Sequence, residues 1–151
     1  MDSFTQLIAP LFESLGLYST NNGLGEHLKG MGLDCNDYSR QSTYNLIALY
    51  LIAINSVIII NYYYGVLNRV PFNRLQSWLI NVLIGAIILF IIAWSYPHHD
   101  LAAGTYCKDL KINSSDCTGF AITAAIYSVV WSFLLSMAIK WKSGVNKKLP
   151  F

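Results

Sequence analysis

The chain has 151 residues, of which 54% are hydrophobic and 12% are charged, and its mean hydropathy is +0.43. Soluble domains carry about 25% charged residues, so this composition excludes an ordinary soluble domain. The net charge of +2 is too small to indicate nucleic acid as a partner. The sequence predicts an all-α integral membrane protein, with three transmembrane helices plus an N-terminal amphipathic helix in a single membrane domain over residues 1–151.

Residues 1–43 form a polar tail with one amphipathic helix, predicted over residues 3–16. Its apolar side chains recur at helical spacing; they are Phe4, Leu7, Ile8, Leu11, Phe12 and Leu15. Gly16 can end this helix, and Pro10 is expected to kink or restart it. An ordinary packed helix is the preferred interpretation, and contact with lipid is the alternative. Residues 18–43 are rich in Asn, Gly, Ser and Asp and are expected to form a loop.

Three stretches of about 20 mostly apolar residues match the roughly 30 Å hydrocarbon core of a bilayer. The predicted segments are, in chain order, a first span 45–64, an inner loop 65–73, a second span 75–96, an outer loop 97–118, a third span 119–141 and a cytoplasmic tail 142–151. Pro97 is expected to break the second helix. The lipid bilayer is therefore the first predicted partner.

The basic residues predict an orientation. With three spans, one side holds six basic residues and no acidic ones; these are Arg69, Arg74, Lys140, Lys142, Lys147 and Lys148. The positive-inside rule places this side, with the C-terminus, in the cytoplasm and the N-terminus outside. The six residues can anchor the chain to anionic lipids of the inner leaflet. An ordinary stop-transfer flank, which has the same composition, is the preferred interpretation.

All three cysteines fall on the predicted outer side, where a disulfide can persist. The preferred pair is Cys107 with Cys117, since these two residues lie in one loop. A bond from Cys35 to one of the loop cysteines is the second possibility, and three reduced thiols are the third.

Small and polar residues recur along the faces of the predicted spans. They are Asn55, Asn61, Ser77, Asn81, Gly85, Ala124, Ser128, Ser132 and Ser136. Small side chains let membrane helices approach closely, and a buried amide needs a hydrogen-bond partner. These faces can pack the three helices of one chain together. The preferred interpretation is that they also contact neighbouring chains, in a homo-oligomer or with other membrane protein subunits. A water-filled pore lined by the same residues is a weaker alternative.

His98, His99 and Asp100 are the only cluster that suggests a metal site or an enzyme, and His27 could join them from the N-terminal tail. Adjacent histidines rarely reach one ion in regular geometry, and this run lies where a helix is expected to enter water. A solvated loop is therefore the preferred interpretation. No metal, cofactor or catalytic residue is predicted, because the sequence contains none of the common motifs for them.

The segment YYYGVLNRVPFNRLQSWLINVL (62–83), together with LGEHLKGMGLDCNDY (24–38), resembles small uncharacterised bacterial multipass membrane proteins. The resemblance covers roughly residues 24–85. It implies a location in the bacterial inner (plasma) membrane and brings no activity, ligand or catalytic residue.

The sequence hypothesis is a non-enzymatic membrane subunit that oligomerises or assembles into a larger membrane complex. A small oligomeric pore or membrane-permeabilising effector is the first alternative. A membrane enzyme or carrier that uses the region from His98 to Asp100 is the second.

Overall fold

The computed structural model describes residues 3–65 and 75–140, and all regular structure in these residues is helical. The helices are α1 (Ser3–Glu13), α2 (Leu24–Leu28), α3 (Thr43–Tyr64), α4 (Leu75–Ala103) and α5 (Ser114–Ile139). Among them, α3, α4 and α5 are long and apolar enough to cross a membrane, so the structure has a helix for each of the three predicted spans.

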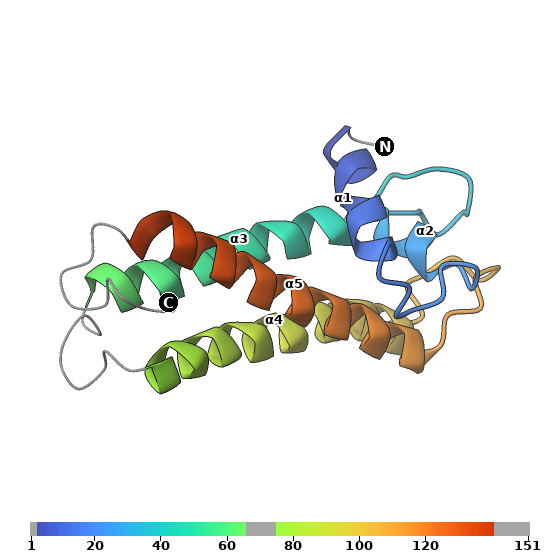
Figure 1. The fold of residues 1–151 in the computed structure, drawn as a ribbon. Coiled ribbons are helices and arrows are strands. Elements are labelled where there is room, and N and C mark those ends of the chain that lie inside the picture. The colour runs from blue at the N-terminus through green and yellow to red at the C-terminus, as the bar shows by residue number, and fades with distance from the viewer. Residues whose placement is uncertain (1–2, 66–74, 141–151) are drawn as a thin grey trace.

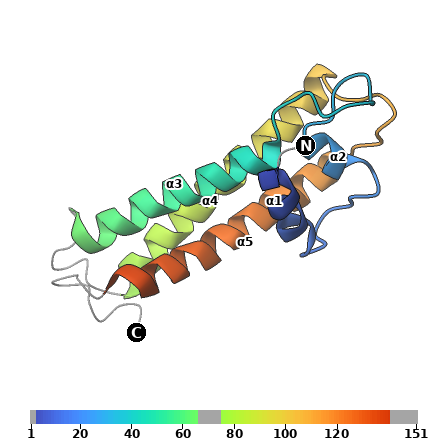
Figure 2. The same ribbon diagram turned by 90° about the horizontal axis from the view of Figure 1, so that it is seen from above.

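The three long helices lie lengthwise beside one another in a bundle (Figures 1 and 2). They alternate in direction, so Thr43, Ala103 and Ser114 all lie at one end, which we call the cap end. The cap itself consists of α2 and the irregular segments 14–23, 29–42 and 104–113. It gathers at this end of the bundle (Figure 1).

The prediction that Pro97 ends the second span is wrong, because α4 continues to Ala103. A proline removes one backbone hydrogen bond from a helix, and packing against neighbouring helices can offset that loss. Pro97 is indeed buried. The predicted loop 97–118 is accordingly shorter: its first residues belong to α4, and α5 begins at Ser114 instead of residue 119.

The N-terminal helix α1 stands across the direction of the bundle (Figure 1) and is seen nearly end-on from above (Figure 2). Its inner face buries Thr5, Ala9 and Phe12, which follow one another at spacings of four and three. The helix ends at Glu13 rather than at residue 16. The helix continues through the exposed Pro10, so the predicted restart of the helix at this proline does not occur.

Aromatic packing fixes α1 to the bundle. The ring of Phe12 lies 5.8 Å from that of Tyr44, 5.7 Å from that of Phe120 and 5.3 Å from that of Tyr127. Such tilted ring pairs contribute about 0.5–1.5 kcal/mol each beyond burial alone. The Tyr127 hydroxyl also donates a hydrogen bond of 2.6 Å to the carbonyl oxygen of Leu11. This helix is therefore part of the core at the cap end.

The short helix α2 lies in a segment that was predicted to be loop. Its two leucines, Leu24 and Leu28, are fully buried against the bundle, which stabilises a helix of only five residues. The preceding segment is tied to α5 by Asp116, whose carboxylate accepts hydrogen bonds of 3.2 Å from the Ser19 amide and the Asn22 side chain.

Candidate functional site

A neutral polar contact lies inside the bundle, where all three long helices meet. The Oδ1 atom of Asn55 on α3 accepts hydrogen bonds from the hydroxyls of Ser128 and Ser132 on α5, each 2.9 Å long. The Nδ2 group of Asn55 donates to the Leu51 carbonyl at 2.8 Å. All three side chains are buried. We call this group the Asn55 contact.

Gly85 supplies the side of α4 that faces the Asn55 contact. A Cβ atom at Gly85 would lie 2.5 Å from Asn55 Oδ1, so a larger residue would have to displace the Asn55 amide from its two serine partners. Glycine lets α4 approach the Asn55 amide directly. The predicted small and polar faces thus meet within one chain.

The same face of α5 continues toward the other end of the bundle. Ser136 is buried and accepts a 2.9 Å hydrogen bond from the indole nitrogen of Trp78. Ala124 is also fully buried. Every member of the predicted α5 stripe is therefore inside the bundle of a single chain.

The remaining residues of the predicted polar faces lie closer to the surface. Ser77 and Asn81 are partly buried on α4, and the Asn81 side chain donates a 2.8 Å hydrogen bond to the Ser77 carbonyl. Asn61 is exposed in the last turns of α3. The structure brings none of these three to the Asn55 contact.

At the cap end, a disulfide joins Cys35 to Cys107. The preferred pair Cys107–Cys117 is therefore wrong, and the second possibility is confirmed. Closeness in sequence was misleading because Cys117 lies on α5, where it is a free, buried thiol. Cys107 instead lies in the segment that packs on the loop after α2.

A cluster of charged and polar groups surrounds Asp100 near the end of α4. The Oδ2 atom of Asp100 lies 3.2 Å from His27 Nε2 and 3.3 Å from Arg40 Nη2. Its Oδ1 atom accepts a 3.2 Å hydrogen bond from the Thr105 hydroxyl. Arg40 also donates to the Thr105 carbonyl at 2.5 Å. We call this group the Asp100 cluster.

His27 is the most buried titratable member of the Asp100 cluster. Burial lowers its pKa below the ordinary value of 6.5, and this effect outweighs the opposing attraction of Asp100. His27 is therefore neutral at pH 7. In the described part of the chain, its Nδ1 atom has no hydrogen-bond partner.

A second charged group links α1 to the cap. Lys29 lies 3.4 Å from Glu13 Oε1 and 3.1 Å from Glu26 Oε1. The Tyr38 hydroxyl donates to the other oxygen of Glu26, and this bond lowers the Glu26 pKa below its usual range. Glu13 also accepts a 3.2 Å hydrogen bond from Tyr44.

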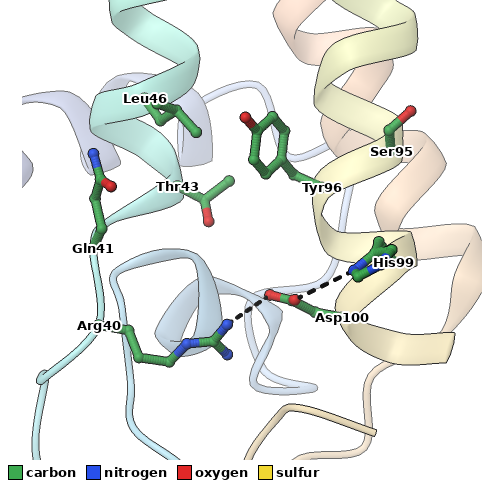
Figure 3. A pocket seen from close by; sticks show the side chains of 8 residues that line it. All are labelled: Arg40, Gln41, Thr43, Leu46, Ser95, Tyr96, His99 and Asp100. Atoms are coloured by element: carbon green, nitrogen blue, oxygen red, sulfur yellow. Dashed lines mark hydrogen bonds and ion pairs between the residues drawn. The ribbon is translucent and has the colours of Figure 1, made fainter. Parts of the chain in front are cut away.

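Beside the Asp100 cluster, a cleft of about 620 Å³ opens between the start of α3 and the end of α4 (Figure 3). Its lining residues are Arg40, Gln41, Thr43, Leu46, Ser95, Tyr96, His99 and Asp100. Figure 3 shows the Tyr96 ring and the Thr43 side chain in the space between the two helices, with Arg40 and Asp100 together at one end. This cleft is the candidate binding site.

The weak metal candidates His98, His99 and Asp100 do not converge. His98 stacks on Trp94, with ring centroids 4.2 Å apart, while the Nδ1 atom of His99 lies 4.0 Å from Asp100. They lie on α4 instead of in the predicted loop. Ligand atoms of Cys35, Cys107 and Asp109 do lie close together. Both sulfurs are used in the disulfide, so they are not thiolate ligands in this state.

The predicted basic anchors fall almost entirely beyond the described residues. These are Arg69, Arg74, Lys142, Lys147 and Lys148, together with most of the predicted loop 65–73 and the whole tail 142–151. Lys140 is described and directly follows α5.

Sequence reasoning missed Arg40 and considered His27 only as a further metal ligand; in the structure both residues complete the Asp100 cluster. No motif marks either residue, since both lie in the polar tail that reads as loop. The one available signal was the pair of leucines at i and i+4 around His27, which indicates a buried helical turn.

Comparison of the chain with protein-family models, with curated proteins and with solved structures finds no match.

Proposed function

We propose that the chain is a non-enzymatic membrane subunit that assembles with an apolar helix of another membrane chain, a second copy included. The observation that carries the proposal is the outward face of α1. Three large apolar side chains form one stripe there, Phe4, Leu7 and Leu11, each between 48% and 64% exposed, and Leu15 in the turn after the helix is also exposed. Contiguous exposed apolar surface is typical of a contact with a partner or with lipid.

The position of α1 favours a protein partner. Its inner face is fixed by Phe12 and by a 2.8 Å hydrogen bond from Asn45 to Thr5, so the outward stripe is held rigidly on the bundle. A surface that is already rigid loses less conformational entropy when it binds a partner. The α1 stripe is the surface through which we expect assembly.

An apolar groove of about 300 Å³ continues the stripe between α1 and the bundle. Leu11 belongs to both, and the groove is lined further by Ala48 and Leu51 of α3 and by Val130 and Leu134 of α5. Such a groove accepts the side chains of an apolar helix. Because the Asn55 contact is satisfied inside the chain, it contributes no free hydrogen-bonding groups to a neighbour, and the proposed interface lies at α1 instead.

The burial of Asn55, Ser128 and Ser132 also weighs against the alternative of a pore lined by these residues. Similarly, Asp100 is held by His27, Arg40 and Thr105, which gives it a structural role in place of the catalytic one in the enzyme alternative.

The proposed location is the inner (plasma) membrane, with the cap outside and the C-terminus in the cytoplasm. The Cys35–Cys107 disulfide supports this orientation, since an oxidising compartment outside the cytoplasm preserves such a bond.

The test is the native mass in mild detergent, with co-purifying chains identified. We expect a mass above that of the 16.9 kDa monomer, from either a second copy or a stoichiometric partner. Leu7→Ala combined with Leu11→Ala should return the protein to the monomer. The matched control is Leu79→Ala combined with Leu83→Ala, which changes two exposed leucines at the same spacing on α4 and should leave the mass unchanged. A wild-type monomer without a partner would contradict the proposal.

A further inference from the structure

The cleft beside Asp100 changes in polarity along its length. Arg40 and Asp100 lie together at one end, while Leu46 lies at the other, near the Tyr96 ring (Figure 3). A volume of about 620 Å³ is within the range of sites that hold small organic ligands. A cleft with a charged end and an apolar end fits an amphiphilic ligand.

The length of α4 places this gradient at a membrane surface. The helix has 29 residues, which is about 43 Å at 1.5 Å per residue and exceeds a hydrocarbon core of roughly 30 Å. Trp94 and Tyr96 are residues typical of the membrane boundary. His99 and Asp100 follow them by one turn, so they lie at the depth of lipid headgroups.

The charges at the polar end are balanced. Arg40 is positive and Asp100 negative, and the two are 3.3 Å apart. Within residues 3–65 and 75–140, Arg40 donates two hydrogen bonds, to Asp100 and to the Thr105 carbonyl, whereas a guanidinium offers five N–H donors. His99, with 83% of its side chain exposed, can donate to the same ligand.

We infer that this cleft binds one zwitterionic phospholipid, with its phosphate on Arg40 and His99 and its glycerol and first acyl carbons against Leu46 and Tyr96. A phosphate takes the remaining Arg40 donors, because arginine binds phosphate oxygens in a bidentate manner. Asp100 keeps the site neutral overall, which favours a headgroup that carries its own positive charge over an anionic one. The inference is independent of the proposed assembly through α1.

The experiment is native mass spectrometry of the delipidated protein in detergent with four separate probes. These are phosphatidylethanolamine, phosphatidylcholine, phosphatidylglycerol and inorganic phosphate. We expect one molecule of either zwitterionic lipid per chain. Arg40→Gln should weaken this binding by about tenfold or more, since it removes a charge-assisted contact.

A second variant tests the cleft without touching the Asp100 cluster. Thr43→Trp places a large ring between the two helices and should exclude the lipid while Arg40 stays paired. Leu49→Trp is the matched control, because Leu49 is exposed on the same helix and lies outside the cleft. Circular dichroism and formation of the Cys35–Cys107 bond report that each variant is folded.

Three results would overturn the inference. Equal lipid retention by the wild type, Arg40→Gln and Thr43→Trp would show only lipid around the bundle. Tighter binding of phosphatidylglycerol would contradict the charge argument. Stoichiometric binding of inorganic phosphate without lipid would make the cleft a site for free anions.

Discussion

The side chains of Asn55 and Asp100 each contact three polar groups. Asn55 lies between apolar helices, whereas Asp100 lies at the cap end. The Asn55 contact uses only neutral hydroxyl and amide groups, all buried. The Asp100 cluster uses an aspartate, an arginine and a histidine whose neutral form is favoured. In the proposed membrane location, charge is expensive within the hydrocarbon and much cheaper at its edge, so the chemistry of each group matches its expected depth.

This difference predicts that the cap and the bundle can be destabilised separately. The cap depends on a covalent bond and on charges, whereas the bundle depends on close approach of helices around one amide.

The largest effect is expected from Cys35→Ser combined with Cys107→Ser. The bond joins residues 72 apart in sequence. In the chain-entropy account, removing a crosslink that closes a loop of this size lowers the stability of the folded state by about 4 kcal/mol. Hydrogen exchange should accelerate in residues 14–42 and 104–113 and stay slow in the middle of α3, α4 and α5. Asn36→Ser, an exposed change in the same loop, is the control. Equal acceleration in the bundle would show that the two regions unfold together.

Substitution of Gly85 by alanine should affect the bundle most. The new Cβ collides with Asn55 Oδ1, and overpacking of this kind costs about 1–3 kcal/mol. The measurement is the unfolding midpoint in a denaturing detergent titration. Asn55→Leu, which leaves the hydroxyls of Ser128 and Ser132 without their acceptor, should lower the midpoint in the same direction. Val57→Leu on the exposed side of α3 should leave it unchanged.

The cap alone should respond to mild acid through His27. The folded-state pKa of His27 is lower than its unfolded value near 6.5, so the unfolded chain binds the proton more readily. The stabilisation is complete above pH 6.5 and is lost as the pH falls toward the folded pKa. Asp100, Arg40 and Tyr106 are the groups that face His27.

Hydrogen exchange of the cap between pH 7.5 and about 5.5, across the ordinary pKa of histidine, measures this effect. His27→Gln should flatten the dependence over this range. A pH dependence that persists unchanged in this variant would assign it to another group.

The smallest effect is expected from Lys29→Gln. Lys29 bridges Glu13 and Glu26, but these side chains are partly exposed, and such ion pairs contribute about 0.5 kcal/mol. The loss should appear in cap exchange at low salt and vanish at high salt, since mobile ions screen the pair. A loss that is independent of salt would show a packing role of the lysine stem instead.

The three long apolar helices were predictable from the sequence, because a backbone in lipid must satisfy its hydrogen bonds internally and a helix of this length does so. The residues of the Asn55 contact were found as well, since an amide in an apolar helix needs a partner. Which partner it takes was not predictable. Asn55 and Ser128 are 73 residues apart in sequence. Helical periodicity indicates only which face of its own helix a residue occupies, so it does not identify the partner on another helix.

The helix boundaries and the disulfide pairing at the cap end were harder to predict from the sequence. Pro97 was expected to stop a helix because its local effect is unfavourable, but tertiary packing in the bundle overrode it. The pair Cys107–Cys117 was favoured by short separation, yet α5 begins early enough to turn Cys117 into the core. The clustering of His27, Arg40 and Asp100 depends on the folded path of three separate segments, which no local pattern encodes.

The disulfide also constrains the order of biosynthesis. It closes a covalent ring from Cys35 to Cys107 that contains both α3 and α4 but not α5. In the proposed topology, two crossings return the chain to the outer side, so the two sulfurs both reach the oxidising compartment only after this helical hairpin is fully inserted. Closure of the ring therefore reports hairpin insertion before the last helix is needed, and a truncated chain that ends after Cys107 should already form the bond.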